Sequence, residues 1–539
     1  MMMGRSEAFR RLRRTIRLAL HRDDTGRAPD DVLESRRGHL QDRDRRRLLR
    51  GAAASLAATV LAPLAPAPRA RAAPRAAGSV AIVGAGLAGL ACADALAARG
   101  IAATVFEAST RVGGRCFSLS GLFPGQVAER GGEFIDTTHS AMRRYANALD
   151  LALEDVGKSA GEAVYFVNGQ RHNEREVVEH FRAFVPAMRA DLRRLGQPTA
   201  SSFTDQDREL DFTSLAEYLE TRGASPLLQA VVDVAYTTEY GLEIEQQSCV
   251  NFLLFIHADR RSKFRPFGVF SDERFHVVEG NQSIADGLAD RLPGEIRFSR
   301  ALVGARRQPD GRIRLAFDAG GQTAETEWDA VVLAVPFSTL REVALDDASL
   351  GLPAEKRFAI DHLAYGTNSK MMIGFDGRPW FTLHGSSGDS FSDLPNHQNT
   401  WETNPARATA QAAILTDYSG GARGASLDPG NLADAAARFL ADLEKVYPGV
   451  GAFVPRDGHG VPLRAHLENW RLNPLARGSY TCNQPGYFTT IAGHEATPVG
   501  NLFFAGEHTS SFYEQQGFME GAVLSGQRAA IEVYRLVRG

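Results

Sequence analysis

Three glycines near residue 85 have the spacing that brings backbone N–H groups against phosphate. Gly84, Gly86 and Gly89 form a G-x-G-x-x-G pattern after an apolar, strand-like run at 79–83, and an Ala- and Leu-rich helical segment follows. The first glycine permits a tight turn, the second lets the backbone approach a pyrophosphate, and the third lets helix and strand pack closely. About 20 residues later, Glu107 ends a second apolar run, where a carboxylate binds a ribose 2′-OH. The segment predicts a βαβ unit that binds a dinucleotide, either NAD or FAD.

The residues after the second run decide between these cofactors. They read E-A-S-T-R-V-G-G-R and resemble the second pyrophosphate-contacting loop of FAD enzymes with the glutathione-reductase-like fold. The resemblance implies that Gly113 and Gly114 free the backbone to approach the cofactor and that Arg115 supplies a fixed cation. Arg111 belongs to the same cofactor-binding loop. FAD is therefore favoured over NAD.

The C-terminal part of the chain resembles the last FAD motif of the same fold. An apolar strand runs into Gly506 and Glu507. The resemblance implies that the acid binds a ribityl hydroxyl and that the next helix, near Phe518 and Met519, points its N-terminus at the flavin. Val303 stands where an apolar residue would face the adenine.

Residues 79–539 as a whole resemble the flavin amine oxidase family, which holds monoamine, polyamine and L-amino acid oxidases. The resemblance implies an α/β fold, in which a glutathione-reductase-like FAD-binding Rossmann domain is interleaved with an α+β substrate-binding domain. It also implies oxidation of an amine to an imine that hydrolyses, with O2 reduced to H2O2. A flavin carries the hard chemistry, so the protein must orient the amine and exclude water.

Four residues take catalytic positions by this resemblance. Tyr480 and Phe518 occupy the places of two facing aromatics, a cage that orients an amine before the flavin. Phe518 departs from the tyrosine that is common in monoamine oxidases. Lys370 matches a lysine that holds a water against flavin N5, and Trp470 lies where a tryptophan stacks close to the flavin.

The substrate stays open between an amine and an L-amino acid. A polyamine oxidase would use a carboxylate to attract a second ammonium, and some members place one at the position of Asp136. An L-amino acid oxidase would need an arginine for the carboxylate. The candidates for these roles are Asp136, Glu133 and Glu239 among the acids and Arg261, Arg265 and Arg274 among the arginines.

Two further expectations concern the cofactor and the reaction. Some family members attach FAD through a cysteine at the position of Ser479, and a serine cannot form that thioether, so FAD is expected to be non-covalent. A carotenoid-type desaturase or protoporphyrinogen oxidase shares the FAD motifs, but the lysine and the aromatic pair argue against this alternative. A flavin-binding protein without turnover is the third reading.

The domain organisation follows from the motifs. The FAD-binding domain is expected at 79–136, 276–345 and 478–539, and the substrate-binding domain at 137–275, which reads as mostly helical, and 346–477. The 539 residues are 44% hydrophobic and 23% charged, as in an ordinary soluble globular protein. The four cysteines lack metal or disulfide spacing and are expected to be isolated core thiols.

The first 72 residues have a different character. They hold 17 Arg against 8 Asp and Glu, a balance of +9, which leaves −12 on the rest of a chain whose net charge is −3. An acidic body does not favour nucleic acid. Arg45, Arg46 and Arg47 precede an apolar run too short to span a bilayer and a small-x-small site near Ala72, which resembles a twin-arginine export signal. We expect the twin-arginine export machinery as a partner, a periplasmic or secreted location and no transmembrane span. The oligomeric state stays open, a homodimer included.

Overall fold

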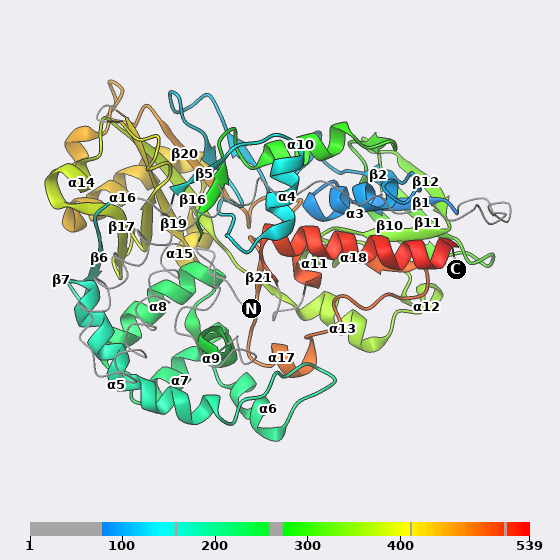
Figure 1. Cartoon of the computed structure of the whole chain (residues 1–539), viewed down its shortest axis with the longest axis horizontal. Coiled ribbons are helices and arrows are strands. Elements are labelled where there is room, and N and C mark those ends of the chain that lie inside the picture. The colour runs from blue at the N-terminus through cyan, green and yellow to red at the C-terminus, as the bar shows by residue number, and fades with distance from the viewer. Residues whose placement is uncertain (1–77, 157–159, 258–272, 410–411, 511–514, 539) are drawn as a thin grey trace, which may run out of the picture.

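The structure is a computed structural model and describes residues 78–156, 160–257, 273–409, 412–510 and 515–538. The expected leader and the candidates Arg261 and Arg265 lie outside the described residues. Figure 1 shows two bodies of secondary structure side by side, one built around the N-terminal strands and the C-terminal helix and the other around a larger sheet with its own helices.

The first body is built on a five-stranded parallel sheet with the order β22-β13-β1-β2-β9. Its strands are short apolar runs, as expected where helices cover both faces of a parallel sheet. They are β1 (Val80–Val83), β2 (Thr104–Phe106), β9 (Ile296–Arg297), β13 (Ala330–Leu333) and β22 (Leu502–Phe504). Segments from the start, middle and end of the chain therefore meet in one Rossmann-like sheet, as the glycine motif predicts.

Two helices of this body pack tightly together. Figure 1 shows α3 (Leu87–Ala97) and α18 (Met519–Arg538) side by side over the parallel sheet. Their close approach requires Gly526, because a Cβ atom there would lie 2.1 Å from the carbonyl oxygen of Ala88. An antiparallel sheet, β12-β11-β10-β14, completes the body. Its strands are β10 (Ala301–Arg307), β11 (Ile313–Asp318), β12 (Thr323–Trp328) and β14 (Ala344–Leu345).

The second body is built on a seven-stranded sheet with the order β20-β16-β19-β18-β17-β6-β7. Five of its strands come from the later part of the chain and two, β6 and β7, come from the block expected to be mostly helical. The strands are β6 (Glu162–Val167), β7 (Gln170–His172), β16 (Ser369–Phe375), β17 (Ser386–Ser392), β18 (Asn399–Glu402), β19 (Ala413–Ser419) and β20 (Ala465–Asn469). Residues 160–257 therefore contribute to both the sheet and the helices of this body.

A group of helices covers one end of this sheet, and side-chain caps mark their first residues. Asn173, Thr204, Ser214 and Ser225 each accept a hydrogen bond from a backbone N–H of the first helical turn. The helices are α5 (Glu174–Leu192), α6 (Asp205–Phe212), α7 (Leu215–Thr221), α8 (Pro226–Tyr240) and α9 (Cys249–His257). Their apolar faces bury aromatic side chains such as Phe181 against one another.

The remaining elements connect these layers. The helices are α4 (Ser140–Ala148), α10 (Gln282–Asp290), α11 (Phe337–Leu340), α12 (Asp347–Leu350), α13 (Ala354–His362), α14 (Pro379–His384), α15 (Gly421–Ser426), α16 (Leu432–Val446) and α17 (Tyr487–Thr490). The short strands are β3 (Ser118–Leu119), β4 (Ala128–Glu129), β5 (Leu153–Asp155), β8 (Phe275–Val277), β15 (Ala364–Tyr365) and β21 (Thr481–Cys482). Among the described residues, the 3-10 turns are η3 (Ile244–Gln246), η4 (Pro429–Asn431), η5 (Val450–Phe453) and η6 (Glu507–Thr509).

Two expectations about the chain as a whole can be compared with the structure. All four cysteines are buried and free, which confirms that they are isolated core thiols. Within the described residues, no helix has both the length and the apolar character needed to cross a bilayer.

Candidate active site

A cavity of about 560 Å³ lies where loops of the parallel sheet meet the seven-stranded sheet. The first body contributes the two glycine loops, the ends of β13 and β22 and the start of α18. The second body contributes three side chains from its sheet: Lys370, Trp401 and Tyr418. Among the expected site residues, the cavity lining includes Gly84, Gly86, Glu107, Arg111, Gly113, Gly114, Arg115, Glu133, Val303, Lys370, Trp470, Tyr480, Gly506, Glu507, Phe518 and Met519.

The glycine loop after β1 has the backbone geometry that its spacing predicts. Gly84 has φ +103°, a conformation that favours glycine. At Gly89, which lies behind the cavity wall, a Cβ atom would lie 1.9 Å from the carbonyl oxygen of Gly84, so only glycine allows this helix and turn to touch. Gly86 is different, because a Cβ atom there would meet nothing within 4 Å. The open side of Gly86 faces the cavity at the first turn of α3, which fits a pyrophosphate.

Glu107 and the second glycine loop close around the first loop. The Glu107 carboxylate accepts hydrogen bonds from the backbone N–H groups of Ala85 at 2.7 Å and Ser109 at 2.8 Å. The N–H of Gly113 donates to the carbonyl oxygen of Ala85 at 2.9 Å. Hydrogen bonds within the protein therefore hold the two loops against each other.

The two arginines of the second loop have different partners. Arg111 lies 3.6 Å from the ring centroid of Phe117 and donates to the carbonyl oxygens of Val112 and Gly114, so it stiffens its own loop. Arg115 donates to the carbonyl oxygen of Ser479 at 2.7 Å and to the Glu507 carboxylate at 3.0 Å. Arg115 therefore ties the second glycine loop to two C-terminal segments.

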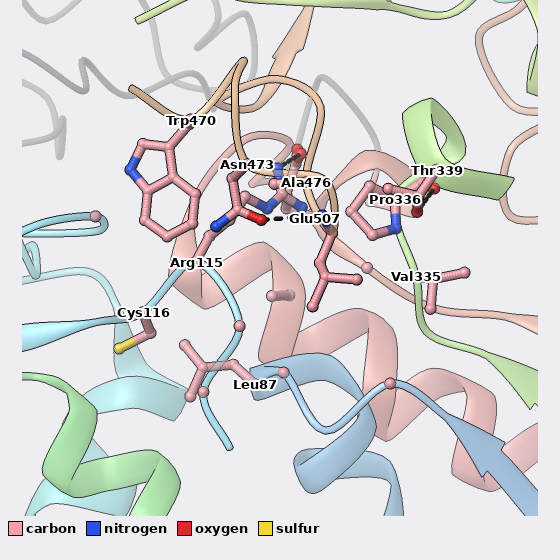
Figure 2. A pocket seen from close by; sticks show the side chains of 18 of the residues that line it. Leu87, Arg115, Cys116, Val335, Pro336, Thr339, Trp470, Asn473, Ala476 and Glu507 are labelled. Atoms are coloured by element: carbon pink, nitrogen blue, oxygen red, sulfur yellow. Dashed lines mark hydrogen bonds and ion pairs between the residues drawn. The ribbon is translucent and has the colours of Figure 1, made fainter. Parts of the chain in front are cut away.

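Figure 2 shows Trp470, Arg115 and Glu507 on one side of this cavity and Leu87, at the start of α3, on the other. Val335, Pro336 and Thr339, which follow β13, form a further wall in the same view. The indole N–H of Trp470 donates to the carbonyl oxygen of Arg130 at 2.9 Å, which fixes the orientation of its ring.

Aromatic side chains form a continuous wall on the side of the seven-stranded sheet. Trp401 lies 5.8 Å from Phe134 and 5.3 Å from Tyr418 between ring centroids. The hydroxyls of Tyr418 and Tyr480 are 2.6 Å apart. Tyr480 donates to the carbonyl oxygen of Glu239 at 2.8 Å, so Tyr418 is the donor of the shared bond. Phe518 lines the same cavity and packs edge-on against His139.

Lys370 and Glu133 form an ion pair in the cavity wall. The Lys370 ammonium lies 2.5 Å from Glu133 Oε2, and the two residues are only 4% and 5% exposed. Lys370 is on β16, whereas Glu133 follows the second glycine loop, so the pair joins the two bodies. The sequence offered both residues as candidates but gave no sign that they are partners.

Three other candidates do not line the cavity. Asp136 is buried beside His139 and accepts a hydrogen bond from the backbone N–H of Glu273 at 2.7 Å. Glu239 lies on α8, and its backbone carbonyl is what contacts Tyr480. Arg274 pairs with Asp155 at 2.7 Å. The structure therefore gives the substrate-binding roles suggested for Asp136, Glu239 and Arg274 no support.

Three residues of the aromatic wall were missed from the sequence: Phe134, Trp401 and Tyr418. Trp401 and Tyr418 reach the cavity because β18 pairs with β19, and β19 pairs with β16, which carries Lys370. Nothing in the spacing of 370, 401 and 418 signals this register. The one available hint is that a tryptophan and a tyrosine stand in short strands whose other side chains are mostly small or polar.

A buried carboxyl near the site gives a pH-dependent prediction. Burial raises the pKa of Glu129 to about 7, although hydrogen bonds from Asn281 and Ser118 act in the opposite direction. The folded protein therefore holds this proton more tightly than the unfolded chain, and wild-type stability falls as pH rises from about 4.5 through 7. Glu129→Gln removes the titration, so its stability relative to wild type should rise by about 3 kcal/mol across that window. Thermal unfolding of both proteins at about pH 5 and pH 8 measures this, and a difference that stays constant with pH would contradict it.

The sequence matches a known protein family over most of its length. Residues 87–534 match the model of a family described as flavin-containing amine oxidoreductase. The chain belongs to this family. The match begins at the first residue of α3 and spans both bodies of the fold, and it makes the protein a flavin amine oxidase. The cavity fits a flavin nucleotide, because the open backbone at Gly86 and the acid at Glu107 stand at one end and the aromatic wall at the other.

Individual relatives cover nearly the whole described chain. A Mycobacterium tuberculosis protein that carries the name flavin-containing monoamine oxidase is 27% identical over 85% of this chain and 97% of its own. A mouse L-amino-acid oxidase is 24% identical over 84% of this chain and 70% of its own. The solved structure of cyclohexylamine oxidase from Brevibacterium oxydans has a TM-score of 0.71 at 20% identity and covers 86% of this chain and 100% of its own. This last likeness confirms the α/β fold with its FAD-binding type of Rossmann sheet.

Proposed function

We propose that the protein binds FAD non-covalently and oxidises a primary amine to an imine, with O2 reduced to H2O2. The amine loses two electrons and two protons, dioxygen gains them, and water then converts the imine to a carbonyl compound and ammonia. The observation that carries the proposal is one continuous cavity, in which the pyrophosphate-type glycine loops share a wall with Lys370, Trp470 and Tyr480.

Different residues of the cavity would bind the cofactor, exclude water from the amine and supply charge. The flavin supplies the two-electron chemistry when it is bound. The backbone at Gly86 and Gly113 is placed to hold the diphosphate, Glu107 the adenosine ribose and Glu507 the ribityl chain. The aromatic wall keeps bulk water from the amine and offers ring faces to its nitrogen. The Lys370 ammonium brings positive charge into the cavity, where it would assist the reduction of dioxygen by a bound flavin.

The described residues that line the cavity favour a substrate amine that carries no carboxylate. Every arginine among the described lining residues already has a protein partner: Arg111 and Arg115 as above, Arg300 with the carbonyl oxygen of Ser299 and Arg477 with Glu342. Lys370 is neutralised by Glu133. A substrate carboxylate would therefore share a guanidinium group with a protein partner or reach a residue outside the described part of the chain.

An L-amino acid is the second candidate substrate. It is supported by relatives such as the mouse L-amino-acid oxidase, which match the chain over most of its length. Arg261 and Arg265 remain its carboxylate candidates. The family description, which names amines, favours both candidates over a desaturase acting on an apolar substrate.

The test of the proposed function is a substrate panel. We expect purified holoprotein to release hydrogen peroxide and ammonia in equal amounts from apolar primary amines. Peroxide from L-amino acids alone would replace the first candidate with the second. Release of neither product from any amine or amino acid would contradict the proposal as a whole.

Acid precipitation tests the attachment of the cofactor. The Ser479 hydroxyl donates to Asn368 Oδ1 at 2.6 Å and has no thiol chemistry. Cys116 lines the cavity, but burial raises the pKa of its thiol well above the usual range, which keeps it protonated and unreactive. We expect acid to leave a colourless protein pellet with the flavin in the supernatant. Yellow colour retained in the washed pellet would show a covalent link.

Export by the twin-arginine route is a separate proposal. It is supported by the paired arginines and the apolar run of the leader. Cells that express the full chain should contain the mature protein outside the cytoplasm, and Arg45→Lys with Arg46→Lys should retain it inside. Equal distribution of both forms between the fractions would contradict the proposal.

A further inference from the structure

The Lys370 ammonium is held by two acceptors that belong to the other body. Its Nζ donates to Glu133 Oε2 at 2.5 Å and to the carbonyl oxygen of Gly131 at 3.2 Å. An ammonium has three N–H groups, and no third acceptor lies within hydrogen-bond distance among the described residues. Because Lys370 lines the cavity, the third N–H is available to whatever occupies it.

The second oxygen of Glu133 is also engaged. The indole N–H of Trp401 donates to Glu133 Oε1 at 3.0 Å, and the ring centroid of Trp401 lies 5.6 Å from the Lys370 nitrogen. The carboxylate therefore accepts hydrogen bonds on both oxygens from the seven-stranded sheet. The ammonium and the carboxylate therefore both have hydrogen-bond partners, which a buried ion pair needs in order to be stable.

The loop that carries Glu133 has little freedom to move. A Cβ atom at Gly131 would lie 1.8 Å from the carbonyl oxygen of Arg115, and one at Gly132 would lie 2.9 Å from Met519. Asn281 donates from its side-chain amide to the carbonyl oxygens of Gly132 and Glu133 at 3.0 and 2.7 Å. Glu133 is thus a fixed carboxylate on a clamped loop.

We infer that Glu133 is a positioning residue that holds the Lys370 ammonium aimed into the cavity. Burial without a counter-charge favours the neutral amine over the ammonium. The carboxylate at 2.5 Å supplies that counter-charge and, together with the carbonyl oxygen of Gly131, fixes the direction of the ammonium. The inference rests on the proposed function, in which that charge assists the passage of two electrons and two protons to O2.

The test isolates the reaction with O2 from the amine. Holoprotein is reduced by light with EDTA as the electron donor, in the absence of substrate, and is then mixed with O2, and the rate of flavin reoxidation is followed at about pH 6.5 and pH 9. Each variant is compared with wild type at the same pH, because the Glu129 carboxyl, whose pKa burial raises to about 7, titrates in all of them. Glu133→Gln, which keeps an acceptor for Trp401, should slow by about tenfold at the higher pH, because its unpaired lysine loses the proton. Lys370→Met should be slow at both.

A matched control breaks another buried ion pair of the same sheet. Glu402 pairs with Arg378 at 2.6 Å, is buried next to Trp401 in β18, and does not line the cavity. Glu402→Gln should lower thermal stability but keep the wild-type pH profile of reoxidation. A Glu133→Gln profile that runs parallel to wild type, or a Glu402→Gln profile that acquires the same pH dependence, would overturn the inference.

Thermal unfolding of the same proteins supplies a readout that needs no turnover. Glu133→Gln and Lys370→Met should each lower the midpoint by about 5 °C, and the double variant should lose less than their sum. Additive losses would overturn the pairing. Because light replaces the amine, failure of every substrate in the panel would contradict the proposed function and leave this inference intact.

Discussion

Replacing Gly86 by valine is expected to abolish flavin binding while the protein still folds. The backbone at Gly86 is extended, with φ −72° and ψ 177°, which any residue adopts, and a Cβ atom there meets nothing within 4 Å. The added side chain would instead fill the space at the first turn of α3 where the pyrophosphate approaches. We expect the affinity for FAD to fall by at least about 100-fold, measured by flavin content after purification and by titration of the apoprotein.

A matched glycine controls for the substitution itself. Gly458 is exposed, has no atom within 4 Å of a Cβ and does not line the cavity. Gly458→Val should keep full flavin content. If Gly86→Val purified with as much flavin as Gly458→Val, the pyrophosphate would not lie against this turn.

Arg115→Met is expected to destabilise the protein and to loosen the segment that carries Tyr480. Arg115 donates to the carbonyl oxygen of Ser479, and its partner Glu507 accepts from both the backbone N–H and the hydroxyl of Thr481. Removing the cation leaves a buried carboxylate without its counter-charge, which costs about 3 kcal/mol. Flavin content should fall as well, because the second glycine loop loses its tie to β21.

The double variant Arg115→Met with Glu507→Gln separates the charge from the packing. It removes the unpaired carboxylate, so it should recover part of the lost stability. Thermal unfolding of the single and double variants measures this recovery. A double variant less stable than Arg115→Met would show that the ion pair is not the source of the loss.

Local patterns predicted the elements around the first glycine loop. The run at 79–83, the glycine spacing and the acid at Glu107 depend on residues close together in the chain, and the structure has β1, α3 and β2 where these patterns place them. Helices with regular apolar spacing were similarly predictable, such as α16 at Leu432–Val446. In each case the residues that determine the local conformation lie close together in the sequence.

The substrate side of the cavity could not be predicted in this way. Trp401 and Tyr418 reach the wall through the antiparallel register of β18 and β19, and β6 joins the sheet by pairing in parallel with β17 more than 200 residues later. Such pairings depend on the whole fold rather than on spacing. The contact between Glu133 and Lys370 joins the two bodies of the fold, and no pattern in the sequence relates these two residues.

The side chain of Asp136 does not lie where its position in the sequence suggested. Its place after the glycine loop suggested a carboxylate that attracts a substrate ammonium. In the structure its side chain is buried beside His139 and accepts from the backbone N–H of Glu273. Of the acids after the second glycine loop, it is Glu133, three residues earlier, that lines the cavity, because its side chain contacts Lys370 on β16 and Trp401 on β18.

Anaerobic mixing of the holoprotein with apolar primary amines tests the proposed function most directly. The oxidised flavin band should bleach with each productive amine, with one amine consumed per flavin, and admission of O2 should restore the band with release of one hydrogen peroxide. A flavin that stays oxidised with every amine and L-amino acid, in a protein that binds FAD fully, would contradict amine oxidation at this cavity.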